Sequence, residues 1–240
     1  MFNELKKHGV TEKTPENILL GAGTLHKNLK FGYYLLKSAP DDWNSGYSHY
    51  YTRTGEAPNY TYTPRTQAVE DFVENTFYYK GWNFEQSLIG ATSGGNKLTI
   101  TPEIKTVEVD GALVKVKGLD FKQGEVAKLE TNLVEITPDL LKMTVIGQSN
   151  SQQEVDGYAE IVSKADIAAG DYYDNIGFIG HKTNGDPIIV ILDNALCTTG
   201  FEGEAKNKDN TVVKVTFECY QEVTGDLMKL PYHIYYPAQG

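Results

Sequence analysis

The alternation of apolar and polar residues along the chain is typical of β-strands over most of its length. Strict alternation over four to eight residues predicts a strand with one buried and one exposed face. Such patterns occupy residues 98–109, 114–116, 127–136, 175–182, 188–192, 195–202, 211–221 and 230–236. Thr183-Asn184-Gly185-Asp186-Pro187 predicts a tight turn between two of these strands. We therefore predict a mainly β fold, most simply a sandwich or barrel.

The alternation changes phase within the long apolar pattern that follows residue 87. Apolar positions are even-numbered from Leu98 to Ile104 and odd-numbered at Val107 and Val109. A shift by one residue moves the side chains to the other face, so we expect a bulge near Lys105–Thr106. A second shift is predicted at the end of strand 127–136.

One short helix is predicted over residues 138–146, flanking the sheet. Thr137 is a favourable N-cap, Pro138 suits the first helical position and Asp139 complements the helix dipole. Gly147 is expected to supply the left-handed stop.

Residues 38–86 differ from the rest in being rich in aromatic residues and poor in aliphatic ones. They hold both tryptophans and seven of the sixteen tyrosines: Trp43, Trp82, Tyr47, Tyr50, Tyr51, Tyr60, Tyr62, Tyr78 and Tyr79. Apolar spacing within the segment predicts an amphipathic helix over residues 66–78. We expect an insertion or extended loop, either packed by its own aromatic side chains or forming a subunit contact.

The remaining N-terminal part is predicted to be an arm followed by a strand. Residues 1–16 are polar and charged, as expected of an arm outside the core. Gly21-Ala22-Gly23 indicates a bend or a close backbone approach within the following strand. We expect residues 1–240 to form a single domain.

The charge balance argues against sequence-specific nucleic-acid binding. The net charge is −10, and no basic cluster offers a surface for phosphates. The acidic excess is concentrated in residues 151–200, where it serves either solubility or repulsion of a polyanion. The eight acids there are Glu154, Asp156, Glu160, Asp166, Asp171, Asp174, Asp186 and Asp193.

Neither a secretory nor a membrane segment is predicted. The first ten residues lack an apolar signal-peptide core, and no run approaches the ~20 apolar residues of a membrane span. We expect a protein made in the cytoplasm. Cys219 lies on the apolar face of its strand, and the sequence leaves open whether Cys197 and Cys219 pair.

The sequence predicts no catalytic residue, no metal site and no cofactor, and we expect no enzyme. The segment from Gly90 to Leu98 is similar to a phosphate-binding loop, but Asn96 separates Gly95 from Lys97 and a strand follows instead of a helix. The five histidines are scattered and neither cysteine lies in a CxxC motif, so a zinc site has no support.

The chain contains an ordered set of motifs. They are Pro15-Glu16-Asn17-Ile18 with Gly21-Ala22-Gly23, then LIGATSGGNKLTITPEIKTVEVDG (88–111), VKVKG (114–118) and TNLVEITPDLLK (131–142), followed by a β-rich C-terminal third. This ordered set resembles the major tail protein, the tail-tube subunit, of long-tailed, siphovirus-like bacteriophages. The resemblance covers residues 11–37 and 86–235, and residues 41–85 depart from it.

The resemblance implies a tail-tube-like β-sandwich or barrel that assembles with copies of itself. Subunits of the family form hexameric rings that stack into a hollow tube, with tape-measure, tail-terminator and tail-tip proteins as further partners. DNA would be a non-specific cargo in the lumen, no membrane is involved, and the protein would belong to the virion. An acidic lumen, with residues 151–200 as candidates, would keep DNA from adhering.

Two alternatives remain at this point. A β-sandwich binding module could recognise carbohydrate or a host surface, with Trp43, Trp82 and the tyrosines as a stacking platform. Another phage tail protein, such as a terminator, would form a single ring and stop there.

Overall fold

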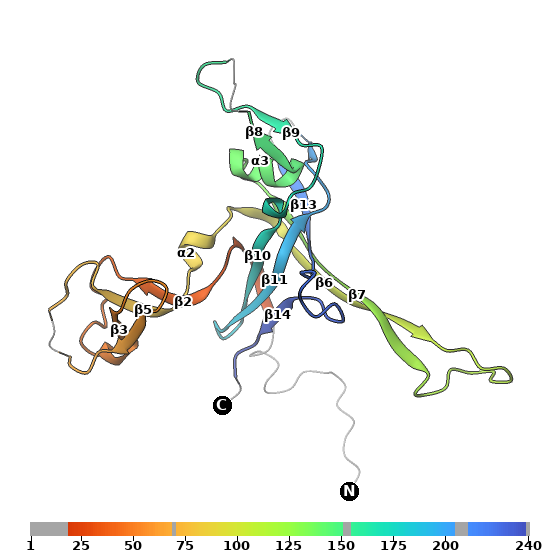
Figure 1. Cartoon of the computed structure of the whole chain (residues 1–240), viewed down its shortest axis with the longest axis horizontal. Coiled ribbons are helices and arrows are strands. Elements are labelled where there is room, and N and C mark those ends of the chain that lie inside the picture. The colour runs from red at the N-terminus through yellow and green to blue at the C-terminus, as the bar shows by residue number, and fades with distance from the viewer. Residues whose placement is uncertain (1–18, 69–70, 151–154, 205–210, 239–240) are drawn as a thin grey trace, which may run out of the picture. The chain divides into compact units, whose positions relative to one another are not determined.

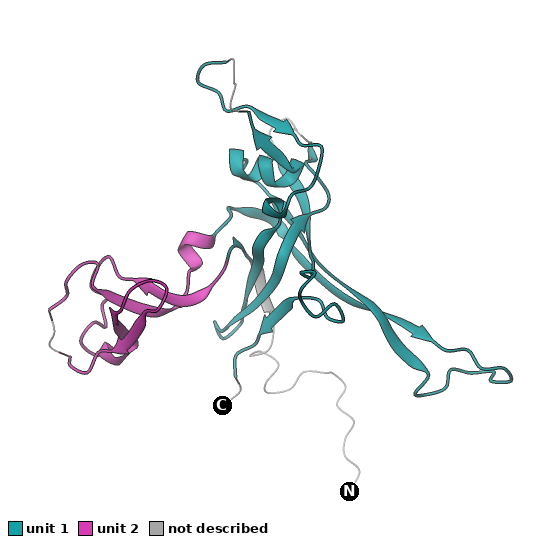
Figure 2. Ribbon diagram, in the orientation of Figure 1, with its two compact units in different colours: residues 1–28, 88–240 teal, residues 29–87 magenta. Residues whose placement is uncertain are grey.

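The computed structural model describes residues 19–68, 71–150, 155–204 and 211–238 (Figure 1). The chain forms two compact units: unit 1 contains residues 1–28 and 88–240, and unit 2 contains residues 29–87 (Figure 2). The fold is mainly β, with 47% strand and 9% helix, which confirms the predicted fold class. The predicted arm, residues 1–16, lies outside the described residues.

Unit 1 is built on one eight-stranded antiparallel sheet. Its main path runs in the order β1-β10-β11-β13-β7-β6, while β12 pairs with β13 and β14 pairs with β11. The strands are β1 (Leu19–Lys27), β6 (Thr92–Thr106), β7 (Asp120–Leu133), β10 (Tyr173–Lys182), β11 (Pro187–Cys197), β12 (Gly203–Glu204), β13 (Val212–Cys219) and β14 (Tyr232–Tyr235). A separate two-stranded sheet pairs β8 (Gly147–Ser149) with β9 (Ile161–Ser163), and a 3₁₀ turn, η2, covers Ala169–Asp171.

The two ends of this strand order approach each other. His26 of β1 forms an isolated antiparallel bridge with Leu88, which lies just before β6. Next to it, the Ile89 amide donates to the Leu25 carbonyl at 2.9 Å. The sheet therefore curls back on itself, and its inner face encloses the core.

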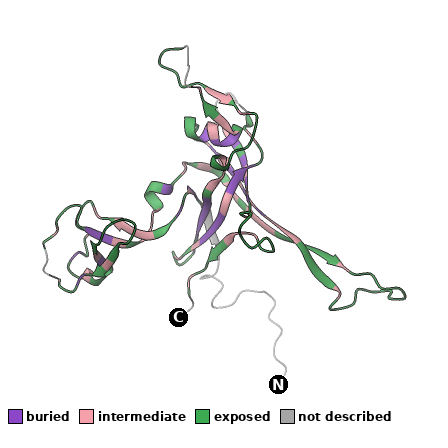
Figure 3. Cartoon of the chain, viewed as in Figure 1, coloured by how far each residue is buried: buried purple, intermediate pink, exposed green. Residues whose placement is uncertain are grey.

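The core of unit 1 follows the alternation seen in the sequence. Odd-numbered residues of β7 point inward from Ala127 to Leu133, and odd-numbered residues of β13 do the same from Val213 to Cys219. Phe217 is fully buried at the centre of this cluster. Figure 3 shows the buried positions concentrated on the strands of this sheet. Both cysteines are buried, free thiols.

The hairpin of β10 and β11 confirms the predicted turn and its two strands. Ile176 pairs with Leu192, and the register continues to His181 opposite Pro187. The Lys182 amide donates to the Asp186 carbonyl at 2.9 Å, which closes the turn. The predicted terminal strand is also present as β14, paired with the first half of β11.

The predicted helix is present as α3 (Pro138–Val145), although it ends differently from the prediction. The Thr137 hydroxyl accepts the Leu140 amide at 3.2 Å, so the N-cap is confirmed. The left-handed residue is Ile146, with φ of 49°, and not Gly147. Gly147 is instead the first residue of β8, because the chain turns one residue earlier to reach that hairpin.

The glycines of β1 mark the predicted close approach. The pairing of β1 with β10 is irregular between Leu20 and Thr24. Gly23 has φ of +68°, and a Cβ atom there would lie 2.4 Å from the Phe178 ring. Only glycine meets both the backbone and the space requirement at this bulge.

Unit 2 is a four-stranded antiparallel sheet in the order β2-β5-β3-β4. Its elements are β2 (Phe31–Leu35), η1 (Tyr47–His49), β3 (Tyr50–Thr54), β4 (Thr61–Pro64), β5 (Phe77–Trp82) and α2 (Phe84–Ser87). The unit begins at Leu29, earlier than the aromatic segment predicted from residue 38, because β2 pairs along its whole length with β5.

The amphipathic helix predicted over residues 66–78 is wrong for the described part of that range. Residues 71–76 form turns and irregular backbone, and Phe77 begins β5. Asn75 adopts a left-handed conformation with φ of 62°, which interrupts a right-handed helix. The apolar spacing of Phe72 and Phe77 is explained by packing instead, since each ring contacts Trp43.

Candidate functional site

The hairpin of β6 and β7 extends well beyond the sheet to which it belongs. Its strands pair from Thr92 opposite Leu133 to Thr106 opposite Asp120. The neighbouring strand β13 pairs with β7 only between Lys128 and Leu133. The outer half of the hairpin is therefore a two-stranded ribbon, seen as the long arm that carries the β7 label in Figure 1.

A loop of residues 107–119 joins the two strands at the end of the ribbon. The Val107 amide donates to the Leu119 carbonyl at 2.9 Å, which closes the loop. Gly111 and Gly118 have φ of 86° and 96° and provide its bends. The loop surrounds a hollow of about 430 Å³, and its Val114–Val116 segment is not the strand predicted there. Val114–Val116 does not form a strand because no other strand lies beside it to pair with it.

Exposed apolar side chains cover the ribbon and its loop. Leu113 is 99% exposed and Val114 is 78% exposed. Ile104 and Phe121 are also exposed. Ile104 pairs with Lys122, whereas Phe121 pairs with Lys105, the residue next to Ile104, so the two apolar side chains lie on opposite faces of the ribbon. We call the exposed apolar surface of Ile104, Val107, Val109, Leu113, Val114, Val116 and Phe121 the hairpin surface.

The exposure of so many apolar side chains in the hairpin surface is unusual for a protein in water. An isolated two-stranded ribbon is at best marginally stable, and a concentration of exposed apolar side chains on such a ribbon is typical of an interaction site. Figure 3 shows this arm exposed along its outer part, in contrast to the buried strands of the sheet. The hairpin surface is accordingly the strongest candidate for contact with another protein surface.

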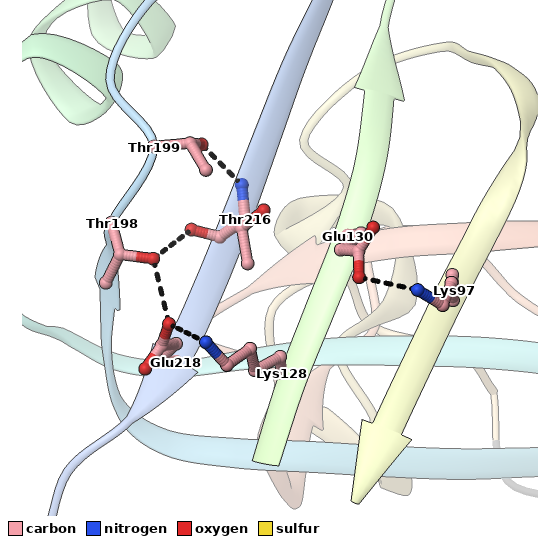
Figure 4. Close-up of polar contacts among 7 residues, drawn as sticks. All are labelled: Lys97, Lys128, Glu130, Thr198, Thr199, Thr216 and Glu218. Carbon is pink, nitrogen blue, oxygen red and sulfur yellow. Dashed lines mark hydrogen bonds and ion pairs between the residues drawn. The ribbon is translucent and has the colours of Figure 1, made fainter. Parts of the chain in front are cut away.

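The inner half of the same hairpin carries a different, polar surface on its outward face. Lys97 and Glu130 form an ion pair at 2.9 Å, and Lys128 and Glu218 form another at 2.7 Å (Figure 4). The hydrogen bond from Lys97 lowers the pKa of Glu130, and the bond to Glu218 raises the pKa of Lys128.

Threonines at the end of β11 extend this outward polar row. The Thr198 hydroxyl donates to Glu218 at 3.2 Å, and the Thr199 hydroxyl accepts the Thr216 amide at 2.8 Å (Figure 4). Lys97, Glu130, Lys128 and Glu218 are thus paired within the chain. The exposed apolar residues of the hairpin surface begin only beyond the part of the hairpin that β13 pairs with.

The acids predicted to face a lumen occupy several settings. Asp171 pairs with Lys164, Asp186 lies 3.7 Å from Lys182, and Asp193 lies 3.0 Å from His233. Burial raises the pKa of Asp193, and the neighbouring His233 opposes that rise. Four of the acids are exposed: Asp156, Glu160, Asp166 and Asp174. Glu154 lies outside the described residues.

The other features singled out in the sequence have structural roles in the fold. Ser93-Gly94-Gly95 forms the irregularity where β6 starts to pair with β7, and Gly94 and Gly95 have φ of 77° and 85°. The bulge predicted near Lys105–Thr106 falls between Glu103 and Ile104. Within the described ranges, no three His, Cys, Asp or Glu side chains are grouped so that they could hold a metal ion.

The two tryptophans, predicted to share a stacking platform, lie in different settings. Trp43 is buried in the core of unit 2 with Tyr50 and Phe77, so it is not part of an exposed platform. Trp82 lies on the other face of the sheet, where its ring packs edge-on against Phe31 at 5.3 Å.

The sequence held one signal for the hairpin surface. Val107, Val109, Val114 and Val116 are alternating apolar residues on either side of Asp110-Gly111, a pair typical of turns. That pattern indicates two strands around a turn, and it cannot indicate that no further strand covers them.

Across the parts of the chain that the structure describes, no helix is both long and apolar enough to cross a bilayer. No protein-family model matches the chain, and no curated protein matches it with significance.

Proposed function

We propose that this protein is the structural subunit of a bacteriophage tail tube. It would assemble into stacked hexameric rings that conduct DNA, and it would belong to the virion. The motifs at residues 88–111 and 131–142 suggest this role, and the mainly β fold with the short helix α3 is compatible with it.

The hairpin surface is the observation that carries the proposal. Leu113 is almost fully exposed and Val114 is largely exposed at the end of an arm that leaves its own sheet. Burial of apolar surface contributes roughly 25 cal/mol per Å², so these residues favour association. An arm that docks on a different surface of the next copy gives a head-to-tail contact, which generates rings or open filaments.

The acidic composition supports the same role for a different reason. DNA carries about one negative charge per 1.7 Å of its axis, so an acidic conduit does not retain it. The exposed acids of residues 151–200 are candidates for such a lining, and the net charge of −10 agrees with a protein that does not bind nucleic acid.

Electron microscopy of the purified full-length protein tests the proposal. We expect negatively stained rings or tubes at high protein concentration or in the presence of the tail-tip and tape-measure partners. Sedimentation should show the mass rising with concentration. Compact monomers under all of these conditions would overturn the proposal, and single rings that never stack would point to a terminator instead.

A further inference from the structure

One face of the unit 2 sheet is covered by aromatic rings. Residues that lie opposite each other in an antiparallel pair share a face. The registers Phe31 with Trp82, Tyr51 with Tyr78, and Arg53 with Tyr62 therefore place these side chains together. We call this the aromatic face; its rings are Phe31, Tyr33, Tyr51, Tyr62, Tyr78 and Trp82.

The other face of the same sheet is already used by the core of unit 2. Tyr50 and Phe77 point there and pack with Trp43 and Phe72. The aromatic face is therefore not needed to bury that core. Among its rings, Tyr78 is buried, Phe31 is 55% exposed and the other four are partly exposed.

Contacts among the tyrosines hold the aromatic face in a defined shape. Tyr33 and Tyr62 stack with ring centroids 3.9 Å apart and an interplanar angle of 2°. Tyr51 meets Tyr33 edge-on at 4.9 Å, and Tyr62 meets Tyr78 edge-on at 5.3 Å. Because β2 and β4 are the two edge strands, the stacking of Tyr33 on Tyr62 means that the sheet curves around this face. The surface is thus pre-organised, which lowers the entropy cost of binding.

Two cations lie on the aromatic face. Arg53 lies over the rings of Tyr60 and Tyr78, at 4.3 and 5.0 Å from their centroids. Lys80 lies 5.6–5.8 Å from the ring centroids of Tyr33 and Phe31. The four strands of unit 2 contain no Asp or Glu, and no ion pair of Arg53 or Lys80 is found among the described residues. An anionic group is the complement of this surface.

We propose that the aromatic face binds an acidic polysaccharide. The slightly positive C–H groups on one side of a sugar ring pack on the negative face of an aromatic ring, and the exposed Phe31 ring offers such a surface. A carboxylate on the sugar would be held by the exposed guanidinium of Arg53, which lies 4.3 Å from the centroid of the Tyr60 ring. This function is independent of ring assembly.

Other occupants fit this face less well. Single-stranded nucleic acid also stacks on aromatic rings, but it needs a row of cations along its backbone, whereas this face has only Arg53 and Lys80. A protein partner would usually meet a mixture of aromatic and aliphatic side chains, and the exposed aliphatic residues that share this face are only Leu35 and Pro64.

Titration calorimetry with the full-length protein tests the inference. The probes are polygalacturonate oligomers, neutral dextran oligomers and oligo(dT). We expect binding of polygalacturonate that weakens with salt, and little binding of dextran or oligo(dT). Phe31→Ala should weaken binding at least about tenfold, the usual effect of losing one stacking ring. Arg53→Gln with Lys80→Gln should remove most of the salt dependence.

Matched control variants distinguish a specific loss of binding from a general loss of folding. Thr54→Ala on the opposite face and Lys37→Gln outside the strands should leave the affinity unchanged. No binding of polygalacturonate, tighter binding of oligo(dT), or equal affinity in Phe31→Ala would each overturn the inference. If instead the Phe31→Ala variant abolished rings or tubes, the face would be a contact between copies of the chain and not a glycan site.

Discussion

The guanidinium of Arg65 lies 3.5 Å from the ring centroid of Trp43 and donates a hydrogen bond to the Trp43 carbonyl at 2.7 Å. Both residues are buried, and Arg65 follows directly after β4. A single side chain therefore ties the end of an edge strand to the loop that carries the central tryptophan of unit 2.

Replacing Arg65 by lysine should lower the free energy of unfolding of unit 2 by about 2–4 kcal/mol, because an ammonium group cannot both lie flat on the indole ring and reach the same carbonyl. Thermal unfolding followed by Trp43 fluorescence in a Trp82→Phe background measures this change. Arg53→Lys, at an exposed arginine over Tyr60, is the control and should change stability by less than about 1 kcal/mol. Similar effects of the two variants would contradict the role of Arg65.

Charge at the end of the hairpin should prevent assembly without unfolding the subunit. Leu113→Asp with Val114→Asp removes exposed apolar surface that no described part of the chain covers. We expect rings or tubes to be lost in electron microscopy while the thermal unfolding midpoint stays unchanged. Leu113→Ile with Val114→Ile keeps the apolar surface and should assemble normally; intact tubes in the aspartate variant would contradict the role of the hairpin surface.

Alanine at Gly23 should destabilise the β1–β10 pairing. The added Cβ atom would meet both the Phe178 ring and the Ile179 carbonyl, at 2.4 and 2.6 Å, in a left-handed backbone conformation. We expect a loss of more than about 1 kcal/mol in urea unfolding. Gly170→Ala is the control, since nothing lies within 4 Å of a Cβ atom there. Equal stability of the two variants would show that the bulge yields easily.

Loss of the Thr137 hydroxyl should shorten or fray α3. The Leu140 amide then lacks its acceptor, which typically costs about 1 kcal/mol of stability. Urea unfolding of Thr137→Ala should show this loss, and Thr137→Ser, which keeps the hydroxyl, should restore most of it. A serine variant as unstable as the alanine variant would point to packing of the threonine methyl group instead.

The stability of unit 1 should fall in the alkaline range partly because of Cys219. Burial raises the pKa of this thiol to about 11, so the folded state holds the proton more tightly than the unfolded state does. The resulting stabilisation is present below the unfolded pKa of about 8.5 and is lost as the pH rises toward 11. Urea unfolding between pH 9 and 11 should show a shallower decline in Cys219→Ala, by up to about 1.4 kcal/mol per pH unit.

Chemical reactivity is a second test of the burial and protonation of the Cys219 thiol. Native protein at pH 8 should react slowly with iodoacetamide, because the thiol is both buried and protonated. Unfolded protein should react rapidly at the same pH. Rapid labelling of Cys219 in the native protein would contradict the burial of this strand.

Local rules predicted some elements of unit 1. The turn before Pro187 and the cap at Thr137 each follow from the chemistry of a few neighbouring residues, and both are present. Local rules failed where the helical preference of a segment was opposed by its strand pairing and tertiary contacts. Residues 66–78 carry helical spacing, yet Phe77 joins β5, because its strand pairing and its contact with Trp43 outweigh a weak helical preference.

The sequence by itself determined that this is a mainly β chain, since alternation shows that each strand has a buried and an exposed face. Alternation does not say which strand lies beside which, because that depends on contacts between residues far apart in the chain. Only the tertiary structure decided that β13 stops beside the inner half of β7 and leaves Leu113 and Val114 uncovered. Only the tertiary structure, likewise, buried Trp43 and left Phe31 exposed, because both faces of the unit 2 sheet carry aromatic residues and the alternation in the sequence does not say which face the core covers.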